Sequence, residues 1–194
     1  MEQKSPSNKR VVTFGELMLR LSPDNNERLI QAKQFQINYG GSEANVAASL
    51  SMFGEESFFV SQIPDSLVGD AALNSLRSLG VRTEHVLRGG PRLGIYFLEH
   101  GAAIRSSKVV YDRANSSMSR VRPGMIDWNS ILLEKDWFHI TGITPALSNS
   151  CAAASIEAIT AAKSLSLTTS CDLNYRKKLW SKAAAKDVMS QMVQ

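Results

Sequence analysis

The chain has 194 residues, of which 43% are hydrophobic and 21% are charged. This balance suits one globular domain of ordinary size and is not that of a disordered chain. No run approaches the roughly 18 apolar residues that a membrane span needs, and the polar first ten residues are not followed by the apolar stretch of a secretory signal. The two cysteines, Cys151 and Cys171, form neither a disulfide framework nor a metal-site spacing. We therefore expect a cytoplasmic protein without a membrane partner.

The formal net charge is +4, from 22 Lys and Arg against 18 Asp and Glu. These cations are scattered along the chain, whereas a nucleic-acid-binding protein gathers them on one face. We expect no nucleic-acid partner. A modest basic excess is compatible with an enzyme of small anionic substrates, and equally with many proteins that bind no anion.

Short apolar or alternating runs predict strands, and 3.6-residue periodicity predicts helices. We interpret residues 1–10 as a disordered tail. The predicted strands, in chain order, are 11–14, 17–21, 35–39, 57–61, 94–99, 103–111, 136–141 and 167–173. The predicted helices are 42–53, 68–79, one capped by Ser148 or Asn149, and one from Trp180 onward.

Strands that alternate with helices indicate an α/β fold, with a parallel sheet covered by helices on both faces. Two stretches, at about 17–39 and 85–113, are rich in strands and contain no helix. The sequence therefore predicts an α/β core with a small second sheet, a lid, built from these two insertions.

The segment Tyr39-Gly-Gly-Ser-Glu-Ala-Asn-Val-Ala47 joins a strand directly to a helix. Gly40 and Gly41 let a backbone approach a ligand closely because they carry no Cβ. The amide of Asn45, in the first helical turn, can bind hydroxyls. A plain tight turn with a solvent-facing Asn is the alternative. The segment lacks the G-x-G-x-x-G spacing of dinucleotide-binding loops.

With this segment the chain resembles the PfkB (ribokinase-like) carbohydrate kinases, whose N-terminal signature is a Gly-Gly-x-x-x-Asn-x-Ala run. Further segments match in the same order: 15–23, 63–81 and 172–180. The resemblance runs from Val11 to about Lys182. It implies a ribokinase-like parallel sheet flanked by helices, a β-sheet lid, and phosphoryl transfer that uses ATP and Mg²⁺.

Within that family the chain is most similar to the branch that phosphorylates 2-keto-3-deoxygluconate. That substrate carries a carboxylate, for which a guanidinium is the best partner. The run Tyr111-Asp112-Arg113 resembles the branch's Tyr-x-Arg, and Tyr96 resembles its other aromatic contact. Strand alternation predicts Tyr111 and Arg113 on one face. An ordinary lid strand with an exposed Arg is the alternative.

The resemblance implies a role for each matching residue. Hydroxyls of the sugar would contact Gly40, Gly41 and Asn45, and the carboxylate end would contact Tyr96, Tyr111 and Arg113. The nucleotide phosphates would lie near Asn174 and Arg176, although a strand-end cap and a surface cation are the simpler interpretation of that pair. Glu16 is expected to form a lid hydrogen bond or to be solvated, without a catalytic role. No metal ligand is assigned.

The family's second signature, a Gly-Ala-Gly-Asp run that supplies the catalytic base, does not occur in these 194 residues. We expect the base beyond Gln194, so that this chain is the N-terminal part of a kinase domain, lacks the C-terminal part of the fold and is inactive alone. The alternatives are another PfkB kinase, such as a fructokinase, and a truncated non-catalytic binding module. A homodimer through the lid is implied by resemblance only.

Overall fold

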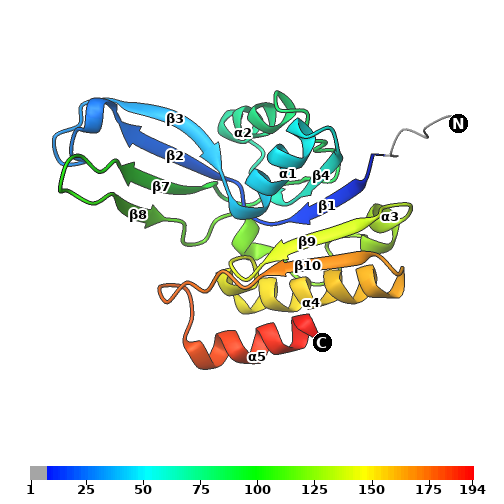
Figure 1. Ribbon diagram of the computed structural model, residues 1–194. Helices are drawn as coiled ribbons and strands as arrows, with labels where there is room; N and C mark the ends of the chain where they lie inside the picture. Colours follow the sequence, from blue (N-terminus) through cyan, green and yellow to red (C-terminus); the bar gives the residue numbers. More distant parts are fainter. Residues whose placement is uncertain (1–7) are drawn as a thin grey trace, which may run out of the picture.

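The computed structural model describes residues 8–194, and its core is a parallel four-stranded sheet (Figure 1). The strand order is β10-β9-β1-β4, with bounds β1 Arg10–Phe14, β4 Glu56–Val60, β9 Trp137–Thr141 and β10 Thr168–Asp172. All three strand pairs are parallel. These strands are the apolar runs of the sequence, and Val12, Phe14 and Phe138 are fully buried. Of the expected tail, residues 1–7 lie outside the described residues, and Arg10 already belongs to β1.

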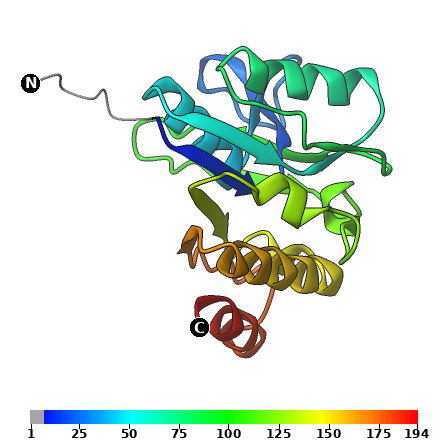
Figure 2. The ribbon, with the colours of Figure 1, turned by 90° about the vertical axis from the view of Figure 1, so that its right-hand side faces the viewer.

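Helices cover both faces of this first sheet, as the alternation predicts. Figure 1 shows α1 (Ser42–Met52) and α2 (Leu67–Arg77) on one side, and α4 (Asn149–Ser164) and α5 (Lys182–Val193) on the other. In the view of Figure 2, α2 again lies above the sheet, and α4 and α5 again lie below it. The side chain of Ser148 caps α4 by accepting a hydrogen bond from the Cys151 N–H. The short helix α3 (Trp128–Leu132) was not predicted. None of the helices within residues 8–194 has the length and apolar character of a membrane span.

The two helix-free insertions form a second sheet, which projects away from the core (Figure 1). Its order is β3-β2-β7-β8, with bounds β2 Met18–Pro23, β3 Phe35–Gly40, β7 Gly94–Glu99 and β8 Lys108–Asp112. Two antiparallel hairpins, one from each insertion, are joined by the parallel β2/β7 pair. This arrangement confirms the predicted small sheet.

The start of β8 differs from the prediction of residue 103. Ala102 and Arg105 instead pair as a bridge across a tight turn, in which Ala103 has a φ of 50°. The strand therefore begins only at Lys108. The remaining short elements were also not predicted: β5 (Gln62–Ile63), β6 (Leu87–Arg88), η1 (Asp24–Asn26), η2 (Met118–Arg120) and η3 (Pro145–Leu147).

The chain segments that pass between the two sheets lie against one another and form a joint. At the β3–α1 junction, a Cβ on Gly41 would lie 1.9 Å from the carbonyl oxygen of Glu16, which follows β1. Arg92, before β7, donates through both Nη atoms to the carboxylate of Asp112 at the end of β8, at 2.8 and 2.9 Å. The Ser117 N–H donates to the Arg92 carbonyl at 2.8 Å. These contacts fix the second sheet relative to the first at one end.

Candidate substrate pocket

A cavity of about 1070 Å³ lies beside this joint, between the second sheet and the loops that follow the first-sheet strands. Ligands of parallel α/β sheets commonly bind at the carboxyl ends of the strands, and the loops after β9 and β10 contribute here. Seven residues predicted from sequence line the pocket: Gly40, Gly41, Asn45, Tyr96, Tyr111, Arg113 and Arg176. Lining residues that the sequence did not single out are Met18, Ser42, Val109, Val110, Ala114, Ile143, Tyr175, Lys177, Lys178 and Leu179.

The two glycines of the β3–α1 junction have different surroundings. A Cβ on Gly40 would meet the Tyr96 hydroxyl at 3.3 Å and the Asn45 Oδ1 at 3.5 Å, so its missing side chain leaves room among pocket residues. The missing side chain of Gly41 instead leaves room for the backbone of Glu16. Gly41 therefore requires glycine because of packing inside the joint, and contact of either glycine with a ligand remains a prediction.

Asn45 lies on the exposed side of the first turn of α1. Its Oδ1 accepts a hydrogen bond from the Gly41 N–H at 3.5 Å, the outer limit for such a bond. A contact this weak leaves the amide able to bind a ligand hydroxyl.

The second sheet contributes an aromatic pair and a cation to the pocket. Tyr96 on β7 and Tyr111 on β8 are directly paired across the strands, with ring centroids 5.9 Å apart. The Arg113 Cζ lies 5.7 Å from the centroid of the Tyr111 ring. Arg113 follows the last residue of β8 rather than lying within it, yet it is brought beside Tyr111 as the alternation predicts.

Glu16 has the first of the two environments that the sequence suggested, a hydrogen bond to the second-sheet insertion. Its carboxylate forms an ion pair with the Arg113 guanidinium, through Oε2 and Nη2. The Glu16 side chain is only 3% exposed and the Arg113 side chain only 11%. Glu16 is therefore a buried partner of a pocket residue, although it does not itself line the pocket.

The loop after β10 contributes a cationic run. Arg176, Lys177 and Lys178 all line the pocket and are exposed. Asn174 does not line it, but its Nδ2 donates to the Ser42 Oγ at 3.3 Å, and Ser42 does. The backbone of Asn174 has a φ of 39°, in the left-handed region, two residues beyond the end of β10 at Asp172.

Glu43 is a second buried carboxylate that sequence reasoning missed. Its side chain is at the start of α1 and is 1% exposed. Its Oε1 accepts hydrogen bonds from the Thr141 N–H and Oγ1, both at 2.9 Å, and from the Thr144 Oγ1 at 2.7 Å. Burial raises the pKa of this carboxyl, and the hydrogen bonds partly oppose the rise. Through these hydrogen bonds, Glu43 connects the β3–α1 junction, which lines the pocket, to the end of β9.

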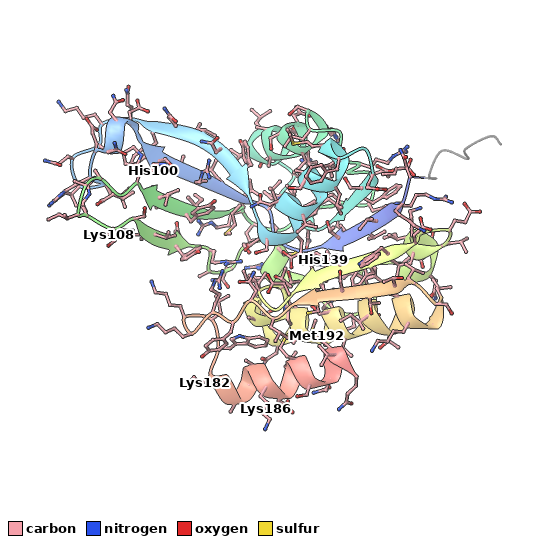
Figure 3. All side chains as sticks on the ribbon, in the orientation of Figure 1. His100, Lys108, His139, Lys182, Lys186 and Met192 are labelled. Carbon is pink, nitrogen blue, oxygen red and sulfur yellow. The ribbon has the colours of Figure 1, made fainter. Side chains whose placement is uncertain are left out.

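Other titratable groups offer little chemistry of their own. Burial raises the pKa of both Cys151 and Cys171 to about 11, which leaves them as weakly reactive thiols near neutral pH. Figure 3 shows His100 at the far end of the second sheet and His139 on β9, well apart. Residues 8–194 contain no group of three His, Cys, Asp or Glu side chains placed to hold a metal. No described carboxylate lines the pocket, so these residues do not fit a resident Mg²⁺.

Comparison with known proteins finds one family and several similar enzymes. The model of the family described as pfkB family carbohydrate kinase matches residues 8–194. The 2-dehydro-3-deoxygalactonokinase of Haloferax volcanii is 37% identical over 182 residues, which cover 94% of this chain and 57% of that protein. The 2-dehydro-3-deoxygluconokinase of Thermoproteus tenax is 33% identical, over 90% of this chain and 53% of that protein.

A solved structure gives the same result. The crystal structure of 2-dehydro-3-deoxygluconokinase from Thermotoga maritima matches with a TM-score of 0.92 and 49% identity, over 94% of this chain and 56% of that one. This match confirms the expected ribokinase-like arrangement of a helix-flanked parallel sheet with a small second sheet. The chain spans about half the length of the relatives that it matches.

Proposed function

This chain belongs to the pfkB family of carbohydrate kinases, and we propose that its protein phosphorylates a 2-keto-3-deoxy sugar acid such as 2-keto-3-deoxygluconate, with ATP as the donor. In this proposal the chain supplies the substrate-binding half of the enzyme. One observation carries it: the Arg113 guanidinium is held beside Tyr111, which is paired with Tyr96, and all three residues line the pocket. A planar cation with several N–H donors matches a carboxylate, which neutral sugars lack.

Each side of the pocket has a distinct task in this proposal. On the side of the second sheet, Arg113 and the two tyrosine hydroxyls bind the keto-acid end. At the β3–α1 junction, the backbone of Gly40 and Gly41 and the Asn45 amide bind sugar hydroxyls. On the side of the β10 loop, Arg176, Lys177 and Lys178 offset the charge of nucleotide phosphates, and Asn174 orients this loop through Ser42.

These residues bind and orient the reactants, which is a large part of catalysis by positioning, but they include no base. No described Asp or Glu lines the pocket to accept the proton of the attacking hydroxyl. We infer that residues 8–194 alone bind the sugar acid without phosphorylating it.

The Arg113 assignment can be tested with two variants in the intact protein. We expect Arg113→Ala to weaken keto-acid binding by about 100-fold, since a hydrogen bond to a charged group contributes roughly 1.5–3 kcal/mol. Binding of neutral fructose should change by about twofold or less. Arg113→Lys keeps the charge but loses the planar fork, and should give an intermediate loss. Isothermal titration calorimetry with both sugars measures these effects.

Arg92→Lys is the matched control, because Arg92 also pairs with a carboxylate at the joint but does not line the pocket. Equal losses for fructose and the keto acid in the Arg113 variants would overturn the assignment. A wild-type protein that phosphorylates fructose in preference to the keto acid would favour a fructokinase. Binding without turnover by the intact protein would favour a non-catalytic module.

The expected homodimer through the second sheet remains a prediction. Exposed apolar side chains on that sheet support it: Ile37 is 64% exposed and Val110 is 51% exposed.

A further inference from the structure

The cations that line the pocket differ in how their charge is balanced. Arg113, on the side of the second sheet, pairs with the buried carboxylate of Glu16. On the side of the β10 loop, Arg176 donates only to the backbone carbonyl of Tyr175, at 3.3 Å. Within residues 8–194, no ion pair is formed by Arg176, Lys177 or Lys178. One side of the pocket therefore presents a neutralised cation, and the other presents uncompensated positive charge.

Glu16 is held firmly in place behind Arg113. It lies on the chain segment between β1 and β2, and its backbone carbonyl is packed against Gly41. On the other side, a Cβ on Gly94 would lie 2.7 Å from the Glu16 Oε1 and 3.2 Å from the Arg113 Cβ. The glycine at the start of β7 thus makes room for the ion pair. Closely packed on both sides, the carboxylate has little freedom to move away from the guanidinium.

We infer, on the basis of the proposed function, that Glu16 is a positioning residue that sets the anion specificity of Arg113. It fixes the orientation of the guanidinium and cancels most of its charge. Arg113 then selects a monoanionic, planar carboxylate by the direction of its N–H groups. Phosphate groups are left to the uncompensated cations of the β10 loop.

Electrostatics gives this selection its direction. An anion near Arg113 is attracted by the guanidinium and repelled by Glu16, and both interactions scale with the charge of the anion. A phosphoryl group carries about 1.5 to 2 negative charges near pH 7 and is repelled more strongly than a carboxylate. A guanidinium has five N–H donors, so the bond to Glu16 leaves others for a carboxylate. Without Glu16, Arg113 would attract any anion, including the phosphates of ATP.

Two substitutions in the intact protein separate charge from position. Glu16→Gln removes the charge with little change of shape, and we expect it to lower the preference for keto acid over inorganic phosphate by about tenfold or more. Glu16→Asp keeps the charge but shortens the reach to Arg113. It should weaken keto-acid binding while phosphate binding remains poor. The preference is measured as the ratio of the two dissociation constants, with phosphate determined by competition against the keto acid.

Glu99→Gln is the matched control. Glu99 is also a buried carboxylate of the second sheet, 5% exposed, and its Oε1 lies 3.7 Å from the Arg105 Nε. It does not line the pocket, so its substitution should leave the ratio unchanged. A structural defect would weaken both ligands in parallel, and thermal unfolding of each variant reports such a defect directly.

The outcomes distinguish this inference from the proposed function. Keto-acid binding that depends on Arg113 but shows the same preference in wild type and Glu16→Gln would overturn the role of Glu16 and leave the proposed function standing. If Glu16→Gln does not fold, poor keto-acid binding by Glu16→Asp without a gain in phosphate binding supports the inference, and unchanged keto-acid binding overturns it. Keto-acid binding that does not depend on Arg113 in the wild type would overturn both.

Discussion

Two buried carboxyl groups at the joint, those of Glu16 and Glu43, have different partners. Glu16 faces a guanidinium, whereas Glu43 faces only neutral donors from Thr141 and Thr144. A buried charge without a cation is costly unless hydrogen bonds compensate for its lost hydration. The desolvation of Glu43 accordingly outweighs its hydrogen bonds, and the pKa of its carboxyl is raised. Holding the β3–α1 junction in place through Glu43 should therefore cost stability whenever the carboxyl is ionised.

We predict that Glu43→Gln becomes more favourable relative to wild type as pH rises from about 4 to 7. A carboxyl whose pKa is raised in the folded state binds its proton more tightly there than in the unfolded chain. Wild-type stability therefore falls as pH rises from the unfolded pKa, about 4.3, through the folded one. Gln does not titrate and shows no such fall. Urea unfolding at several pH values measures the difference.

Glu27→Gln is the control for the general effect of removing a carboxylate, because Glu27 is exposed. The difference in unfolding free energy between this variant and wild type should not change between pH 4 and 7 in the way expected for Glu43→Gln. The raised pKa would be contradicted if the stability difference between Glu43→Gln and wild type did not change with pH, or if wild type became the more stable of the two as pH rises.

At the scale of elements, the two adjacent glycines of the β3–α1 junction have different roles. We expect Gly41 to be needed for folding and Gly40 to be needed for ligand binding. Gly41→Ala places a Cβ 1.9 Å from the Glu16 carbonyl oxygen, a backbone atom that cannot move aside easily. We expect a loss of about 3 kcal/mol or more of unfolding free energy, at the upper end of overpacking effects. Gly40→Ala meets only the ends of two side chains, the Tyr96 hydroxyl at 3.3 Å and the Asn45 Oδ1 at 3.5 Å. It should fold with a loss of about 1 kcal/mol or less but bind the keto acid more weakly.

Chemical denaturation and calorimetric titration of the same two variants test this division of roles, and each glycine serves as the control for the other. A well-folded Gly41→Ala protein would show that the close approach is relieved by backbone movement. A Gly40→Ala protein with normal affinity would show that the Tyr96 hydroxyl does not contact the ligand.

Local sequence signals predicted most elements, the family resemblance supplied most of the predicted residues that line the pocket, and the failures share a physical cause. Runs such as 11–14 are apolar enough to identify buried strands, and the Gly-Gly-x-x-x-Asn run identifies a strand-to-helix junction. Neither signal reveals that a carboxylate is buried. Glu16 meets Arg113 at a separation of 97 residues, and Glu43 meets Thr141 at 98. Only the assembled joint brings these partners together, so no local pattern distinguishes such carboxylates from solvated ones.

The same limit applies to the boundaries of short elements. The run 103–111 is predicted as one extended strand, but the turn at Ala102–Arg105 delays β8 until Lys108. There the carboxylate of Glu99 and the carbonyls of Asn26 and His100 draw in the Arg105 side chain. These tertiary contacts override the local preference for extended backbone.

For the whole molecule, the pocket lies between two parts of unequal stability. The first sheet is covered by helices on both faces, whereas every residue of β8 is exposed and the strand pairs only with β7. Amide exchange follows local opening, which requires little free energy where few apolar contacts are broken. We predict that amides of 108–112 exchange about 100-fold faster or more than those of β9, as a gap of roughly 3 kcal/mol in opening free energy implies.

The keto acid should reduce the difference in amide exchange rate between 108–112 and β9. The bound ligand would contact Tyr111 and Arg113 on one side and groups on the first-sheet side of the pocket on the other. A ligand that binds only the closed state stabilises it by mass action, by about 2.7 kcal/mol at 100 times its dissociation constant. Hydrogen exchange measured by mass spectrometry, with and without the keto acid, should show slower exchange in 108–112 and no change in β9, which serves as the internal control. Exchange in 108–112 that stayed the same under saturating keto acid would mean that the second sheet does not close on its ligand, and would place the carboxylate elsewhere than at Arg113.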